Sequence, residues 1–452
     1  MLNKVLIANR GEIAVRIIRA CRELGIRCVA VYSTADRRAL HVQLADEAIC
    51  IGGPAAKDSY LKADALLTAC KLTGCDALHP GFGFLSEDAE FAQQCADCGV
   101  TFIGPTPEAI SLLGDKARAK QTMIAAGVPV VPGSDGTVHT PDEAKKIAEK
   151  IGYPLLIKAA AGGGGRGIRP VFKPEELESQ MLAASAEAKA CFGSDALYME
   201  RYLQNPKHVE VQIIADQFGN VVHLGERDCS MQRRNQKLLE ESPCPILNDS
   251  LRDQMGQAAV RAAKQCGFVS AGTVEFLTDG KEFFFMEMNT RIQVEHPVTE
   301  SVTGVDLVQA QLRIAAGEPL GLTQEDIALR GHSIECRVLA ENPSLGFRPC
   351  AGTIQSFHAP GGPGIRIDSA IYQGCDVPPF YDSMLAKVIV HAPTREQAIA
   401  KMRWALAEFI VEGIDTNIDL QLSLIKTDQF LSGDYNTGTL TALGITEPKK
   451  EG

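Results

Sequence analysis

The sequence lacks long apolar runs, is poor in aromatic residues and has no strong excess of either charge. No uncharged apolar stretch approaches the ~18 residues needed to cross a bilayer, which argues against a membrane-spanning protein. Aromatic residues make up 6% and the formal net charge is −11, a mild acidic excess that argues against broad binding to nucleic-acid phosphates. With 45% hydrophobic and 22% charged residues, the 452-residue chain has the composition of a globular protein of about three domains.

The N-terminus also lacks the pattern of a secretory signal. Its short apolar run is followed at once by Asn9, Arg10 and Glu12. The fourteen cysteines are therefore expected to be reduced and mostly buried, and a cytoplasmic location is expected. Cys95 and Cys98 form one close pair, but no second pair completes a zinc site.

Two common nucleotide-binding signatures are missing as well. The first strand-to-helix turn, at 9–12, has one glycine where the dinucleotide fingerprint has three, which disfavours nicotinamide binding. The glycine run at 162–167 follows Lys158 instead of preceding a lysine, so it does not match a P-loop. A glycine run after a strand still lets backbone amides approach phosphate oxygens, and it therefore favours a phosphate-covering loop over a flexible linker.

Apolar periodicity predicts a mixed α/β and α+β protein. In the first hundred residues, strands alternate with helices, which predicts an open parallel sheet. Beyond a glycine- and proline-rich boundary at 127–136, the expected strands and helices indicate an α+β region. In the strand at 208–216, apolar and polar residues alternate, which predicts a half-buried strand. The expected strands are 4–8, 28–32, 75–78, 100–103, 153–159, 196–203 and 208–216, and the expected helices are 11–24, 108–126, 141–151, 174–191, 249–266 and 394–409.

Residues 273–289 read as two strands joined by a turn, and their arms carry oxygen ligands for a hard cation. Glu275 and Glu287 lie on opposite arms, and Asn289 shares the face of Glu287. A regular two-residue turn would leave the two glutamates on opposite faces, so a shared site requires an odd-numbered loop or a bulge, with Gly280 at positive φ. We expect Mg²⁺ or Mn²⁺ there, bridging nucleotide phosphates; the alternative is a solvated acidic hairpin.

Two further segments carry charges suited to small anions. If the segment after Asn289 is extended, Arg291, Gln293 and Glu295 alternate on one side and present a planar cation beside a carboxylate. Such a set can hold an oxyanion and remove its proton, whereas an ordinary surface ion pair is the alternative. Residues 227–237 form a basic cluster suited to phosphate or carbonate, and a solvated face is its alternative. Its members are Arg227, Arg233, Arg234 and Lys237.

Taken in order, these residues resemble the ATP-grasp enzymes and, more narrowly, the biotin carboxylase component of biotin-dependent carboxylases. The resemblance covers nearly the whole chain, and its longest segments are HPGFGFLSED at 79–88 and EMNTRIQVEHPVTE at 287–300. It implies an N-terminal Rossmann-like domain (1–113), an ATP-grasp domain (114–317) with a mobile glycine-rich lid (about 131–203), and a C-terminal mixed β domain (330–445). It also implies that ATP phosphorylates bicarbonate to carboxyphosphate, which supplies carbon dioxide to biotin.

The resemblance assigns roles residue by residue. Those matching nucleotide-binding positions are Lys116, Lys158, Gly164, Gly165, Glu200, Leu203, His208, Gln232, Asn235, Glu275 and Glu287. Glu275, Glu287 and Asn289 match metal ligands, with two metal sites expected. Lys237, Arg291 and the backbone of Val294 match the bicarbonate pocket. Glu295 matches the base that deprotonates bicarbonate, and Arg337 matches the arginine that stabilises the biotin enolate.

Departures from the family pattern are few. Asn235 stands where histidine is usual, Phe82 replaces a tyrosine near the expected biotin region, and Arg201 replaces a lysine. Because the family's Ala-Met-Lys-Met biotinylation sequence is absent, we expect biotin to arrive on a separate carrier protein, with carboxyltransferase subunits as further partners and a homodimer implied by the family. The alternatives are another ATP-grasp ligase, of the carbamoyl-phosphate or purine-pathway type, and a non-catalytic assembly subunit.

Overall fold

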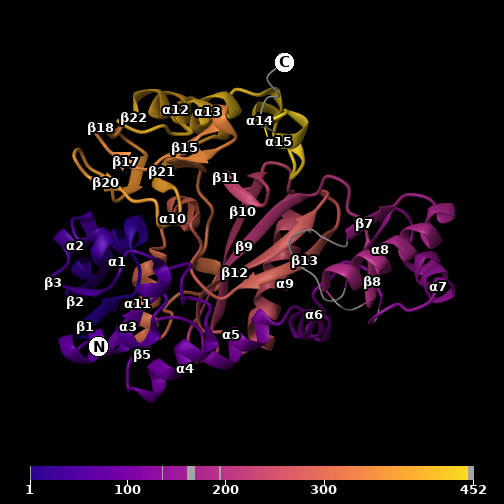
Figure 1. The fold of residues 1–452 in the computed structure, drawn as a ribbon, viewed down its shortest axis with the longest axis horizontal. Coiled ribbons are helices and arrows are strands. Elements are labelled where there is room, and N and C mark those ends of the chain that lie inside the picture. The colour runs from indigo at the N-terminus through magenta and orange to yellow at the C-terminus, as the bar shows by residue number, and fades with distance from the viewer. Residues whose placement is uncertain (1, 135, 160–167, 193–194, 446–452) are drawn as a thin grey trace.

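The N-terminal part of the chain forms a parallel sheet, as the sequence predicts. In this computed structural model, residues 2–134, 136–159, 168–192 and 195–445 are described. The sheet has the order β3-β2-β1-β4-β5 and all its pairings are parallel (Figure 1). Its elements are β1 (Lys4–Ile7), α1 (Gly11–Glu23), β2 (Arg27–Ser33), α2 (Leu40–Leu44), β3 (Glu47–Gly52), α3 (Ala63–Thr73), β4 (Ala77–His79), α4 (Ala89–Asp97) and β5 (Thr101–Phe102).

The expected single helix over 108–126 is wrong, because two helices occupy this segment. Helix α5 (Pro107–Gly114) ends before Asp115, and α6 (Lys116–Ala125) begins after it. Asp115 has an extended backbone, and its carboxylate accepts from the amides of Ala117 and Arg118, which caps α6. Lys116 is therefore the first residue of a helix, at the end where the helix dipole favours anions.

A small antiparallel sheet with two helices projects to one side of the molecule (Figure 1). Its strand order is β7-β6-β8, and the predicted glycine-rich loop, with Gly164 and Gly165, lies outside the described residues. Its elements are α7 (Pro141–Ile151), β6 (Leu155–Ala159), β7 (Ile168–Val171), α8 (Leu177–Phe192) and β8 (Leu197–Arg201).

An antiparallel sheet of eight strands joins the middle of the chain to its C-terminal part. Its order is β13-β12-β9-β10-β11-β14-β21-β19. Helix α9 contacts β9 and β10, while α10 contacts β10, β11, β14 and β21. The elements are β9 (Lys207–Ala215), β10 (Val221–Arg233), β11 (Gln236–Ser242), α9 (Asp249–Gln265), β12 (Ser270–Thr278), β13 (Phe283–Asn289), α10 (His296–Thr303), α11 (Leu307–Ala315), β14 (His332–Leu339), β19 (Ile365–Ser369) and β21 (Met384–Ala392).

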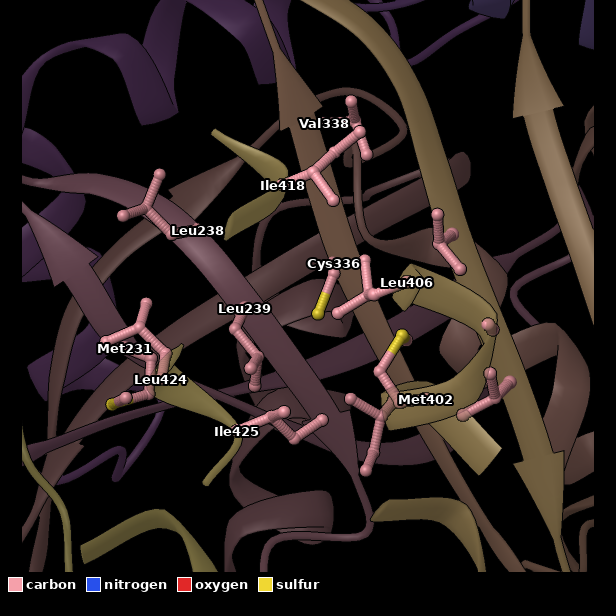
Figure 2. Packing of buried hydrophobic residues seen from close by; sticks show 14 of the residues in the cluster. Met231, Leu238, Leu239, Cys336, Val338, Met402, Leu406, Ile418, Leu424 and Ile425 are labelled. Carbon is pink, nitrogen blue, oxygen red and sulfur yellow. The ribbon is translucent and has the colours of Figure 1, made fainter. Parts of the chain in front are cut away.

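The C-terminal helices cover one face of β14 and β21. Figure 2 shows Cys336 and Val338 of β14 packed with Met402 and Leu406 of α12 in a buried cluster. Since side chains alternate along a strand, Arg337 lies on the opposite face. The remaining elements are β15 (Glu341–Asn342), β16 (Arg348–Pro349), β17 (Gly352–Thr353), β18 (Ser356–His358), β20 (Asp376–Val377), α12 (Arg395–Glu408), β22 (Ile410–Glu412), α13 (Ile418–Leu424), α14 (Asp428–Ser432) and α15 (Thr439–Ala442).

The expectation that the strand at 208–216 is half-buried is wrong. All nine residues of β9 are buried, including Glu210 and Gln212. The polar side of this strand faces other charged residues instead of water. Among the described residues, no helix combines the length and apolar character required to cross a membrane.

Candidate active site

Four charged residues lie in one row across four neighbouring strands. Glu287 of β13 is opposite Glu275 of β12, which is opposite Glu210 of β9, which is opposite Arg227 of β10. Residues opposite one another in antiparallel strands share a face of the sheet. The row therefore places three glutamates and a buried guanidinium side by side.

The hairpin register confirms that Glu275 and Glu287 share a face. Phe276 pairs with Phe285, but Glu275 pairs with Glu287, so Met286 is an extra residue in β13. The loop itself has an even number of residues, 279–282, and Gly280 has a φ of +86°. Of the two predicted possibilities, an odd-numbered loop and a bulge, the bulge is therefore the one that brings the glutamates to the same face.

Two carboxylates of this row and that of Glu295 meet at the ammonium group of Lys237. Its Nζ lies 2.6 Å from an oxygen of Glu210, 3.1 Å from Glu275 and 2.6 Å from Glu295. Burial would lower the pKa of Lys237, but these three carboxylates raise it well above its ordinary value. Lys237 is therefore charged and joins the predicted bicarbonate residues to the predicted metal ligands.

The other side of Glu295 is held by Arg337. Arg337 donates from Nη2 to Glu295 at 2.9 Å and from Nε to Glu240 at 2.6 Å. Burial alone would raise the pKa of Glu295, yet Lys237, Arg337 and Arg227 hold it well below its ordinary value. Glu295 is thus a fully buried, ionised carboxylate between two cations.

Glu240 behaves differently, and it makes stability depend on pH. Burial raises its pKa from 4.5 to about 7, although Arg337 opposes the change. A pKa raised by folding gives a stability contribution that is complete below about 4.5 and is lost as pH rises through about 7. In Glu240→Gln this loss is absent, so the stability advantage of the parent protein over the variant should shrink between pH 5 and pH 8. Urea denaturation at both pH values measures it, and a constant or growing advantage would contradict the assignment.

The alternation of Arg291, Gln293 and Glu295 required an extended segment, and this condition is not met. Residues 290–295 form an irregular turn, and Glu295 immediately precedes α10. Arg291 pairs instead with Glu87, at 2.9 Å from Nε, and Gln293 donates to Glu275 at 3.3 Å. The carboxylate beside Arg291 is thus Glu87, while the cations beside Glu295 are Lys237 and Arg337.

The predicted basic cluster at 227–237 does not form one patch. Arg227 is fully buried against Glu210, whereas Arg233 stacks 3.6 Å from the centroid of the Phe347 ring. Only Arg234 follows the solvated alternative; it shares a tight turn with Asn235, and both have positive φ. Asparagine tolerates this conformation better than most residues.

The remaining predicted nucleotide contacts come from two parts of the fold, the small sheet with β6 and β8 and the large sheet with β9 and β10. Lys158 of β6 contacts Glu200 of β8. The pKa of Lys158 is lowered to about 8, mainly by burial and further by the positive charges of the nearby Lys120 and Lys116. His208 of β9 lies 3.0 Å from Glu275, and Gln232 of β10 is opposite Lys237. Leu203 is half-buried just after β8. Clustered ammonium groups at a helix start suit a polyphosphate.

Four residues of the site were missed from the sequence: Glu210, Arg227 as a buried partner, Glu240 and Glu87. The alternation of Glu210 with Val209 and Val211 is a signal that could have been used, whereas Arg227 lies between Glu226 and Asp228 and gives no such signal. Glu87 lies in the segment HPGFGFLSED and binds Thr290 and Arg291 across 203 and 204 residues. No local signal gives such a pairing.

Comparison with known proteins agrees with this geometry. Residues 1–110 match the family "Biotin carboxylase, N-terminal domain", residues 115–323 "Carbamoyl-phosphate synthase L chain, ATP binding domain", and residues 335–442 "Biotin carboxylase C-terminal domain". Biotin carboxylase 1 of Bacillus subtilis is 56% identical, over 98% of this chain and 99% of that protein.

Two solved structures are similar along nearly the whole chain. The biotin carboxylase domain dimer of Hydrogenobacter thermophilus 2-oxoglutarate carboxylase, in complex with MgADP, ADP and bicarbonate, has a TM-score of 0.88 and 50% identity, covering 99% of each chain. A biotin carboxylase from Campylobacter jejuni in complex with a βγ-ATP compound has a TM-score of 0.89 and 48% identity, covering 98% of this chain and 99% of that one.

The fold is that of the ATP-grasp enzymes. Within that class, the chain belongs to the biotin carboxylase family. Neither the alternative of another ATP-grasp ligase nor that of a non-catalytic subunit is supported.

Proposed function

We propose that this chain catalyses the first half-reaction of a biotin-dependent carboxylase: ATP, bicarbonate and biotin on a separate carrier protein give ADP, phosphate and carboxybiotin. The observation that carries the proposal is the contact of Lys237 with both Glu275 and Glu295. One ammonium group thereby joins the carboxylates suited to metal and nucleotide to the carboxylate suited to bicarbonate. Two substrates bound on either side of it would lie close enough for direct phosphoryl transfer.

The nucleotide lies along the lysine cluster and the acidic row. Lys116 and Lys158 face its phosphates, Glu200 and Leu203 face adenine, and the remaining contacts come from the central sheet. Those remaining contacts are His208, Gln232, Asn235, Glu275 and Glu287, with Gly164 and Gly165 proposed to cover the phosphates. The domain limits 1–113, 114–317 and 330–445, with a lid at about 131–203, belong to the same proposal.

Mg²⁺ or Mn²⁺ would be held by Glu275, Glu287 and Asn289. The donor set fits a hard cation, because Glu275 and Glu287 are opposite each other and the Asn289 amide lies 2.9 Å from Glu275. Burial and the neighbouring Glu275 raise the pKa of Glu287, a cost that a bound cation would remove. When bound, the cation neutralises charge on the phosphates.

Glu287→Gln should therefore weaken the response to Mg²⁺. The variant keeps the shape of the side chain but removes one anionic ligand, so the free Mg²⁺ needed for half-maximal ADP release should rise about tenfold or more. Glu282→Gln is the control, because Glu282 lies in the loop of the same hairpin and pairs with Arg201. Superimposable Mg²⁺ titrations of parent and Glu287→Gln would remove Glu287 from the ligand set.

Bicarbonate is proposed to bind Lys237, Arg291 and the backbone of Val294. Glu295 takes the proton of bicarbonate, which makes the bound substrate a better nucleophile toward the terminal phosphate of ATP. Its attack releases ADP and gives carboxyphosphate. Arg337 stabilises the enolate of biotin; a guanidinium suits this role because it stays protonated. We further propose a cytoplasmic homodimer that works with a biotin carboxyl carrier protein and carboxyltransferase subunits.

The direct test measures ADP release by the purified protein with Mg²⁺, ATP and bicarbonate, with and without free biotin. We expect ADP release to depend on bicarbonate, to be stimulated by biotin, and to be accompanied by carboxybiotin. If biotin neither stimulates release nor becomes carboxylated, the proposal fails. Biotin-independent turnover with ammonia would select a ligase of the carbamoyl-phosphate type instead.

A further inference from the structure

A buried lysine outside the proposed site reaches the loop that carries Glu295. Lys387 lies in the middle of β21, has no exposed surface, and donates from Nζ to the carbonyl oxygen of Val294 at 2.9 Å. It is opposite Arg337 in the pairing of β14 with β21, so both side chains lie on the face that carries the site. No role in the proposed reaction uses it.

The carbonyl that Lys387 holds belongs to the peptide between Val294 and Glu295. In a planar trans peptide the N–H points away from the C=O, so fixing this carbonyl also fixes the amide of Glu295. The preceding carbonyl, of Gln293, is bound by Nδ1 of His296 at 2.8 Å, which fixes the amide of Val294 in the same way. Two buried side chains thus set the direction of the backbone in the proposed bicarbonate pocket.

Lys387 is itself held from a distant part of the sequence. Its Nζ lies 3.1 Å from Glu12, in the first turn of α1, and 3.9 Å from Asp368 of β19, which is opposite it in the sheet. Of these two carboxylates, Glu12 is the nearer to the ammonium group, and Asp368 forms a close pair with Arg366. The turn at 9–12, which lacks a dinucleotide fingerprint, therefore supplies a side chain to the centre of the molecule.

We propose that Lys387, held by Glu12, is a positioning residue that orients the Val294–Glu295 peptide for bicarbonate binding and deprotonation. This inference rests on the proposed function, because it assigns a task to the loop that carries the proposed base. A residue that served only to neutralise Glu12 could be replaced together with Glu12 without effect on the loop. A residue that orients the peptide could not, because the hydrogen bond to the Val294 carbonyl would still be lost.

The experiment compares Lys387→Met, the double variant Glu12→Gln with Lys387→Met, and Lys401→Met. Lys401 is the control: it also donates to two backbone carbonyls, of Pro363 and His391, but lies on α12 away from the site. We expect both Lys387 variants to raise the KM for bicarbonate about tenfold or more, with the KM for ATP within about twofold of the parent, as for a defect confined to one substrate. Lys401→Met should match the parent in both constants.

Amide hydrogen exchange over residues 290–296 gives a readout that does not depend on turnover. Exchange should be faster than in the parent for both Lys387 variants and unchanged for Lys401→Met. Unchanged exchange, or a bicarbonate KM restored in the double variant, would overturn the inference. If Lys387→Met does not fold, the double variant, which leaves no unpaired charge at these two positions, carries the test. Failure of the proposed function would appear separately, as a parent protein without biotin-stimulated ADP release.

Discussion

Replacing Glu295 with glutamine is expected to lower kcat for carboxybiotin formation by about a thousandfold, within the range for loss of a general base. Glutamine has nearly the same shape but cannot accept the proton of bicarbonate. The fold should tolerate the change, because Lys237 keeps Glu210 and Glu275 as partners and Arg337 keeps Glu240. Binding of MgATP should stay near that of the parent, measured by calorimetry.

The low pKa of Glu295 is compatible with this role. Its carboxylate is ionised before bicarbonate arrives because Lys237 and Arg337 stabilise the charge. A bicarbonate ion that accepts hydrogen bonds from Lys237 would weaken this stabilisation and make Glu295 a stronger base. The acid limb of the pH dependence of kcat/KM should accordingly not arise from Glu295, which is already ionised in the free protein.

Glu226→Gln is the matched control for this variant. Glu226 is also buried in the central sheet and also pairs with an arginine, Arg252 at 2.9 Å, but it takes no part in the proposed site. This control should lose stability and keep kcat. If Glu295→Gln retained near-normal turnover, or if its kcat fell no more than that of Glu226→Gln, Glu295 would not be the base.

Local patterns in the sequence predicted the acidic hairpin well. The sequence did not decide between an odd-numbered loop and a bulge, but the requirement that Glu275 and Glu287 share a face excluded a regular two-residue turn, and the structure has the bulge, at Met286. The parallel order of the first strands was also accessible, because short strands alternating with helices favour parallel crossovers. In both cases the relevant information lies within a few residues of the feature.

Features that depend on distant pairings were not predictable. The strand with Glu210 looked half-buried because its polar residues alternate, yet Arg227 and the α10 residue Thr299 cover that side. The sequence left open whether the segment with Arg291 and Glu295 is extended, and the pairing of Arg291 with Glu87 and the start of α10 bend it. A sequence pattern reports which side chains are polar, and it does not report which charges arrive from elsewhere in the fold.

Lys237→Gln is expected to affect both activity and stability. It removes the cation shared by Glu210, Glu275 and Glu295, and breaking a buried pair costs about 3–5 kcal/mol of unfolding free energy. We expect a large loss of bicarbonate-dependent ADP release, about a hundredfold or more, because substrate orientation and charge neutralisation are lost together. Nucleotide binding should weaken less, since Lys116 and Lys158 remain.

The stability defect of Lys237→Gln should have a definite pH dependence. Without the ammonium group, the carboxylates repel one another and their pKa values rise, so the folded variant takes up protons more readily than the unfolded chain. Its stability relative to the parent should therefore improve as pH falls from 8 to 5, as urea denaturation would reveal. A defect that is the same at both pH values would mean that Lys237 does not stabilise these carboxylates, and bicarbonate saturation equal to that of the parent would remove Lys237 from the bicarbonate site. Either result would separate the residues suited to the metal from those suited to bicarbonate and remove the basis for phosphoryl transfer between them.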